Sequence, residues 1–150
     1  MGKKHIVKKS KKELLKERKK VESSVKKEIK IDSSSRLKKG KIFLSCSYNN
    51  IIMTLTDLGG DTLFWSSAGK LGFKGTKKGT SFAASKVAEA MSYAVKKAKI
   101  KEVKVVVEGI GAGRVSALKA LAANGLNITS IRDKTSIPHN GCRARKPRRV

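Results

Sequence analysis

Large apolar side chains are almost confined to residues 41–130 of this 150-residue chain, which fixes where a core can form. The two ends are rich in Lys and Arg and too poor in apolar residues to bury a core. Ninety residues suffice for one small domain. We therefore predict a folded domain at residues 41–133, between a basic, flexible N-terminal extension (1–40) and a basic C-terminal tail (134–150).

The chain carries 36 Lys and Arg against 11 Asp and Glu, a formal net charge of +25. Repulsion between like charges opposes compaction, so this excess indicates a polyanionic partner. Nucleic acid is the first candidate and an anionic membrane surface the second. No apolar stretch approaches the ~20 residues that cross a bilayer, and no apolar segment follows the basic N-terminus as in a secretory signal. Nucleic acid is therefore the favoured partner.

The acidic residues and the cysteines indicate which cellular compartment the protein occupies. Four glutamates interrupt the basic N-terminal run, whereas mitochondrial presequences are poor in acids. Cys46 falls in an apolar strand and Cys142 in the basic tail, and nothing in the pattern pairs them. Two Cys and two His, scattered, lack the spacing of a zinc site. We expect no metal, no cofactor and a reducing compartment.

Hydrophobic periodicity predicts the order βββαβαβ and an α/β domain with a mixed five-stranded sheet, in two or three layers. Asn49-Asn50 is expected to be a two-residue turn, because Asn tolerates positive φ. Gly125 is expected to cap the second helix. The expected strands are 42–48, 51–57, 62–67, 103–107 and 126–133, and the helices are 81–99 and a segment ending near residue 124.

Two segments suggest how the core is filled. Residues 103–107 are nearly all Val, which is typical of a central strand buried on both faces. In the first helix, the apolar side chains fall mainly on one face. These helix residues are Phe82, Val87, Met91, Ala94, Val95 and Ala98.

Residues 69–80 combine four Gly with four Lys and lead directly into a helix. Gly lets backbone N–H groups approach an anion, and the helix N-terminus favours phosphate. The nucleotide-binding P-loop pattern is not matched, because Gly79 is followed by Thr80 with no Lys between them. A flexible solvated loop is the alternative. The candidate phosphate-binding residues here are Lys70, Lys74, Thr76, Lys77, Lys78 and Thr80.

A second glycine-rich turn, residues 109–113, separates a buried strand from a helix. Its third Gly comes too early for a dinucleotide-binding turn, and the chain lacks the repeated βαβ units. It is either a tight structural turn or a helix N-terminus docked on a phosphate, and the two roles are compatible. Gly111, Gly113 and Arg114 are the candidates.

Five of the last eight residues are basic, after a segment that begins at Pro138. Arg suits bidentate phosphate contacts and stacking on bases. A disordered solubility tail and a localisation signal are the alternatives. The candidate RNA-binding residues of the tail are His139, Asn140, Gly141, Arg143, Arg145, Lys146, Arg148 and Arg149.

Acidic clusters can hold the metal ions of nucleases, and Asp57, Asp61 and Glu108 are the residues to consider. Asp57 and Asp61 bracket a Gly-Gly turn, where Asp is ordinary. Glu108 alone does not complete a cluster, and no Ser, Cys or His arrangement indicates a nucleophile. We expect no catalysis.

Several motifs resemble the universal S-eleven family of small-subunit ribosomal proteins. The resemblance covers residues 41–150 and is most specific in the tail. The motifs are Ser47-Tyr48-Asn49-Asn50, Trp65-Ser66-Ser67-Ala68-Gly69, Gly72-Phe73-Lys74-Gly75, Phe82-Ala83-Ala84, Gly111-Ala112-Gly113-Arg114 and Ile137-Pro138-His139-Asn140-Gly141-Cys142-Arg143.

The resemblance implies a ribonuclease-H-like fold used without catalysis, and it adds Asn49 and Asn50 to the RNA-contacting residues. It implies a place on the platform of the small subunit, on central-domain ribosomal RNA near the messenger RNA exit path, beside other small-subunit proteins. Prolines usual in the family are replaced here, for example by Ile110 and Ala112, which makes the glycine turn less stiff. We expect a bacterial cytoplasmic ribosome, with plastid or mitochondrial ribosomes as alternatives. A free nucleoid protein and a ribonuclease remain the competing classes.

Overall fold

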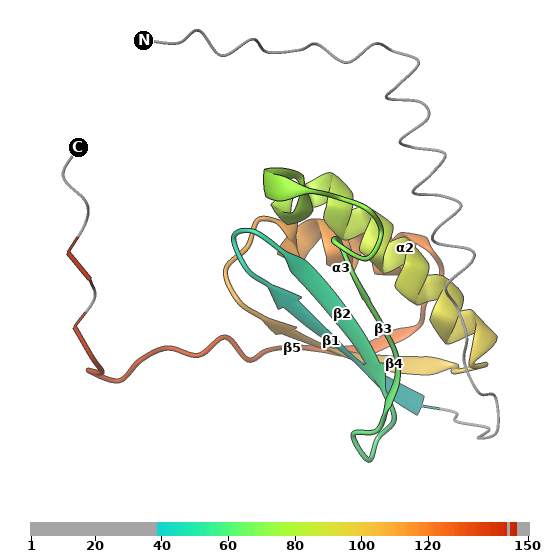
Figure 1. Ribbon diagram of the computed structural model, residues 1–150. Coiled ribbons are helices and arrows are strands. Elements are labelled where there is room, and N and C mark those ends of the chain that lie inside the picture. The colour runs from blue at the N-terminus through green and yellow to red at the C-terminus, as the bar shows by residue number, and fades with distance from the viewer. Residues whose placement is uncertain (1–38, 144, 147–150) are drawn as a thin grey trace, which may run out of the picture.

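The computed structural model describes residues 39–143 and 145–146, and its elements follow the predicted order (Figure 1). The N-terminal extension up to residue 38, and Arg148 and Arg149 of the tail, lie outside the described residues. The elements are β1 (Lys39–Cys46), β2 (Ile51–Thr56), β3 (Thr62–Ser67), the 3-10 helix η1 (Gly75–Gly79), α2 (Ser81–Lys97), β4 (Glu102–Glu108), α3 (Gly113–Ala123) and β5 (Ile128–Asp133).

The five strands form one mixed sheet in the order β3-β2-β1-β4-β5, which confirms the predicted α/β class. β2 pairs antiparallel with both β1 and β3, whereas β4 pairs parallel with both β1 and β5. β1, β3, β4 and β5 therefore all end at the same side of the sheet. We call this side, where β2 begins, the carboxyl edge.

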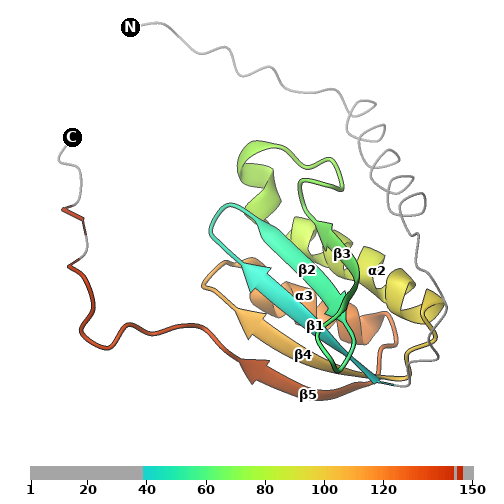
Figure 2. The same ribbon diagram turned by 60° about the horizontal axis from the view of Figure 1, so that its bottom comes forward.

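Both helices pack on one face of the sheet, so the domain has two layers (Figure 2). Alternate strand residues such as Ile42, Leu44 and Met53 point into the core between the layers. The buried side of α2 is rich in Ala, which lets the helix lie close to the strands and to α3. Of the apolar helix residues predicted to face the core, Val87, Met91, Ala94 and Val95 are fully buried.

Two predictions about the core are wrong, and the first fails because the helices cover only one face of the sheet. β4 is buried on one face only: Val103, Val105 and Val107 face the helices, whereas Lys104 is exposed and Val106 half-buried. Phe82 lies half-exposed at the start of α2 and meets the ring of Phe73 edge-on, with 6.0 Å between ring centroids. A nearly all-Val strand did not reveal that its second face lacks a covering layer.

The turn after β1 also differs from the prediction. Four residues, 47–50, separate β1 from β2, and neither Asn49 nor Asn50 is among the described non-glycine residues with positive φ. The Ser47 hydroxyl closes the turn instead. It accepts the Asn50 N–H at 3.0 Å, while the Ser47 N–H donates to the Asn50 carbonyl at 3.0 Å. A side-chain bridge of this kind removes the need for a left-handed Asn.

The two helices end in similar hydrogen-bonded turns but with different residues. After α3, Gly125 has φ of 78°, and the Leu126 N–H donates to the Leu121 carbonyl. This confirms the predicted glycine cap. After α2, which ends at Lys97 rather than residue 99, Lys99 takes the same position with φ of 56°. A residue with a Cβ pays a steric cost there that Gly does not.

Replacing Lys99 with Gly should therefore stabilise the fold by about 1 kcal/mol, because it relieves the left-handed strain at the end of α2. The matched change Gly125→Ala should cost about 1 kcal/mol at the end of α3. Urea unfolding of the full chain, followed by far-UV circular dichroism, measures both. A loss of stability in Lys99→Gly would contradict this account of the helix end.

Candidate nucleic-acid interface

Segments far apart in the sequence converge at the carboxyl edge. The Gly111 N–H donates to the Cys46 carbonyl at 3.0 Å, which joins the glycine turn 109–113 to the end of β1. The Lys134 N–H donates to the Val107 carbonyl at 2.8 Å, so the tail leaves from this edge as well. Figure 1 shows the β1–β2 turn, the segment before α3 and the tail at the same end of the sheet.

The segments can converge because the glycines at their contacts have no side chain. A Cβ on Gly109 would lie 2.2 Å from the Cys46 carbonyl oxygen, and one on Gly111 would lie 2.5 Å from that of Ser47. A Cβ on Gly79 would lie 2.3 Å from the backbone carbonyl oxygen of Tyr48. On Gly113 it would meet the Ile51 side chain at 2.5 Å. The glycine turn therefore has the predicted structural role, and Gly79 likewise lets residues 75–80 lie against the β1–β2 turn.

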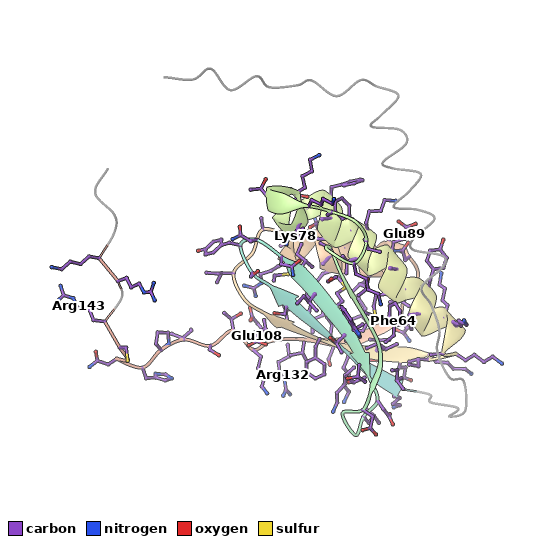
Figure 3. The ribbon with its side chains drawn as sticks, viewed as in Figure 1. Phe64, Lys78, Glu89, Glu108, Arg132 and Arg143 are labelled. Carbon is purple, nitrogen blue, oxygen red and sulfur yellow. The ribbon has the colours of Figure 1, made fainter. Side chains whose placement is uncertain are left out.

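The Gly and Lys segment is more ordered than a solvated loop. Its second half forms η1, and Thr80 then caps α2. The Thr80 hydroxyl donates to the Lys77 carbonyl at 2.8 Å and accepts the Ala83 N–H at 3.3 Å. The capped helix start thereby fixes the position of the lysines. Lys74, Thr76 and Lys77 are exposed, and Lys78, which is labelled in Figure 3, is half-buried.

Lys70 lies apart from the other lysines of this segment. Its ammonium lies 4.5 Å from the centre of the Trp65 ring, a cation–π contact, and donates to the Trp65 carbonyl at 3.4 Å. Lys70 is thus directed toward β3 rather than toward the lysines of η1.

Arg114 does not stand alone at the start of α3, because its guanidinium pairs with Asp133 at the end of β5. The Asp133 carboxylate also accepts the Thr135 hydroxyl at 2.6 Å and the Thr135 N–H at 2.9 Å. The Gly109 N–H in turn donates to the Thr135 hydroxyl oxygen at 3.2 Å. The hydrogen bonds from Thr135, together with the nearby Arg114, lower the pKa of Asp133 to about 2.

The sequence does not indicate a role for Asp133 or Thr135. It predicts Asp133 at the end of a strand, but no spacing signal connects this residue to Arg114, which lies 19 residues earlier. Only the parallel pairing of β4 and β5 brings these residues to the glycine turn. Arg114 is therefore fixed in place, with part of its charge neutralised by the carboxylate.

The two Asn residues of the β1–β2 turn have different environments. Asn49 is exposed at the carboxyl edge. Asn50 is half-buried, and its side-chain oxygen is buried without a hydrogen-bond partner among the residues that the structure describes. The turn thus presents one accessible amide and one partly enclosed amide beside η1.

The described part of the tail is exposed and runs away from the domain. His139, Asn140, Gly141, Arg143, Arg145 and Lys146 are all exposed. Asn140 has φ of 53°, which marks a local bend in the segment. Figure 3 shows Arg143 far from the sheet. The tail therefore begins at the carboxyl edge and extends its cations outward from it.

The acidic residues considered for a nuclease are not brought together. Asp57 follows β2 at the side opposite the carboxyl edge, whereas Glu108 ends β4 at that edge. Within residues 39–143 and 145–146 no three His, Cys, Asp or Glu side chains are grouped to hold a metal ion. Both thiols are free, with Cys46 buried and Cys142 exposed. No helix in this part of the chain is long and apolar enough to cross a membrane.

Comparisons of this chain with a family model and with individual known proteins agree on one family. Residues 40–149 match the family described as Ribosomal protein S11. The chain is 52% identical over 113 residues to the small ribosomal subunit protein uS11c of Cyanidioschyzon merolae, covering 75% of this chain and 93% of that protein. It is 50% identical to uS11 of Treponema pallidum, covering 74% of this chain and 88% of that protein. The uS11c of Mesostigma viride is also 50% identical, with 77% and 88% covered.

If the glycine turn must lie against β1, Gly111→Ala should destabilise the domain by about 1–3 kcal/mol, because its Cβ would overlap the Ser47 carbonyl. Gly59→Ala is the matched control, since its nearest neighbour would be 4.0 Å away. That variant should stay within about 0.5 kcal/mol of the parent chain. Equal stabilities of the two variants in urea unfolding would remove the steric argument.

The network at Asp133 predicts a specific response to acid. The pKa of Asp133 lies below its ordinary value of 3.8, so the stability that its carboxylate contributes is present above about pH 3.8. It is lost as the pH falls toward about 2. Thr135→Val should raise the pKa of Asp133 toward its ordinary value, because the Thr135 hydroxyl bond is the largest single cause that lowers it. Carbon-13 NMR titration of the carboxyl group tests this, and an Asp133 pKa that stays at about 2 in the variant would refute it.

Proposed function

We propose, because this chain belongs to the ribosomal protein S11 family, that it is a structural protein of the small ribosomal subunit and holds ribosomal RNA without catalysis. The observation that carries the binding mode is the convergence at the carboxyl edge. The β1–β2 turn, η1, the glycine turn and the root of the tail come together there from four separate parts of the chain.

Charge at this edge supports RNA phosphates as the ligand. Lys74, Lys77 and Lys78 extend from the segment around η1, and the tail adds at least Arg143, Arg145 and Lys146. Asp133 at the same edge is already paired with Arg114. Phosphate contacts of this kind position a protein on RNA and release counterions, so they dominate affinity and make it depend on salt.

Domain and tail have different parts in this proposal. The edge is held rigidly by backbone hydrogen bonds and by glycines that admit no side chain, so it sets the register of the protein on folded RNA. The tail extends outward from the edge, with Arg143 far from the sheet (Figure 3). In this proposal the tail contacts phosphates that the domain cannot reach. The edge residues that set the register are Asn49, Asn50, Gly111, Gly113 and Arg114. The residues that extend outward are those of the tail, from His139 onward.

The finer location follows the family resemblance. We propose that the RNA is the central domain on the platform of the small subunit, near the messenger RNA exit path and beside other small-subunit proteins. The relatives include a protein of Treponema pallidum as well as proteins named uS11c from two other organisms. We propose a bacterial cytoplasmic ribosome, with plastid or mitochondrial ribosomes as the alternative.

The proposal predicts how binding responds to salt. Deleting residues 143–150 removes five cations, and Lys77→Gln with Lys78→Gln removes two from the edge. Each change should weaken binding to small-subunit RNA and flatten the dependence of log K on log salt by up to about 0.7–0.9 per lost phosphate contact. Lys101→Gln with Lys119→Gln removes two exposed cations that lie away from the edge, and it should change the slope little.

Filter binding or anisotropy at several salt concentrations gives these slopes. An unchanged slope after tail deletion would remove the tail from the interface. Co-sedimentation tests the ribosomal role itself: the chain should run with small subunits in salt that strips loosely bound basic proteins. Recovery only in the free fraction would favour an independent nucleic-acid-binding protein, and metal-dependent RNA cleavage lost in Asp57→Ala would indicate a ribonuclease.

A further inference from the structure

The sheet has a second face, opposite the helices, which none of the proposed RNA contacts uses. We call it the open sheet face. Helices α2 and α3 both lie on the other side of the sheet (Figure 2). Strand alternation and the register place Lys41, Phe43, Ile52, Thr54, Trp65, Lys104, Val106 and Arg132 on the open sheet face.

One row crosses all five strands of this face. The register pairs Trp65 with Thr54, Thr54 with Phe43, Phe43 with Val106, and Val106 with Arg132. Trp65 is 50% exposed and Phe43 39% exposed, which is unusual for large aromatic side chains in a folded domain. They stand two strands apart, a distance of roughly 10 Å at the usual strand spacing.

Cations accompany these rings. Lys41 and Lys104 are neighbours in the register beside the aromatic row, and Arg132 ends it (Figure 3). Lys70 reaches over from the carboxyl edge, with its ammonium 4.5 Å from the Trp65 ring centre. Among the acids of this face, Glu102 is paired with Lys39 at 3.2 Å, and Glu108 lies at the edge. Basic side chains thus outnumber acidic ones around the exposed rings.

We propose that the open sheet face binds unpaired RNA nucleotides, with bases stacked on Phe43 and Trp65 and phosphates along Lys41, Lys104 and Arg132. Base stacking on sheet aromatics with cations beside them is an established way for proteins to hold single strands. This inference rests on the proposed ribosomal RNA binding and adds a second site of different chemistry. The carboxyl edge contacts phosphates, whereas the open sheet face contacts bases.

The residues of the open sheet face favour RNA over a protein as the partner. The cores of protein–protein interfaces are depleted in Lys, yet here lysines flank both aromatic rings. Duplex RNA does not fit, because its bases are already stacked inside the helix and cannot reach a ring. The ligand is therefore a single-stranded loop, bulge or junction that lies next to the RNA held by the carboxyl edge.

Trp65 is the only tryptophan of the chain, so its fluorescence reports on this face alone. The test titrates the full chain with a labelled single-stranded RNA decamer and with the same decamer in a duplex. Anisotropy of the label reports total binding, and Trp65 emission and its quenching by acrylamide report stacking. The decamer should quench Trp65 and protect it from acrylamide, whereas the duplex should bind without doing either.

Variants separate stacking from general attraction. Trp65→Leu and Phe43→Ala should each weaken decamer binding about fivefold to a hundredfold, the range expected for loss of one stacked base. Trp65→Phe should restore most of the affinity, because a ring remains. Tyr93→Ala is the matched control, since Tyr93 is 44% exposed on α2, and it should bind like the parent chain. Circular dichroism confirms that each variant is folded.

The outcomes are distinguishable from those of the proposed function. If RNA binds by anisotropy but Trp65 emission is unchanged and Trp65→Leu binds normally, the open-face inference is overturned and the edge proposal stands. If Trp65 is protected only within assembled small subunits, and Trp65→Leu still binds the decamer normally, another surface of the subunit covers this face and the open-face inference is overturned. If no RNA binds at all, the proposed function fails first.

Discussion

The close approach of the glycine turn to the end of β1 is the contact on which the rest of the carboxyl edge depends. The Gly111 N–H reaches the Cys46 carbonyl, and the missing side chains of Gly109 and Gly111 let two backbones touch. This contact sets where α3 begins and where Arg114 meets Asp133. Gly79 makes a similar approach to Tyr48. Three loops therefore become one surface because backbone packs directly on backbone.

The positive charge of the chain then suits the carboxyl edge to an anionic ligand. A net charge of +25 disfavours a compact chain, but the folded domain buries an apolar core and leaves cations exposed, including those of the carboxyl edge and of the open sheet face. Asp133 compensates locally for the charge of Arg114 and fixes its position, while Lys74 and Lys77 remain exposed at η1. The result is a rigid cationic edge with an extended cationic arm, which suits a structural role on folded RNA within the ribosomal protein S11 family.

The sequence predicted the elements and their order well, because apolar periodicity and Gly positions report local structure directly. The Gly125 cap follows from one such signal. What the sequence could not provide was long-range placement. The run 103–107 suggested a strand covered on both faces, but only the placement of both helices shows that Val106 is half-exposed. The Arg114–Asp133–Thr135 network depends on parallel pairing of β4 and β5, and the aromatic row depends on register across five strands. None of these leaves a spacing signal in the sequence.

The most direct test of the central claim is a cryo-electron microscopy map of small ribosomal subunits that contain this chain. The account predicts that RNA phosphates lie against the β1–β2 turn, η1 and the glycine turn, with the tail running along the RNA from residue 134. A map in which the carboxyl edge faces solvent, or only other proteins, while the chain is held elsewhere would contradict it.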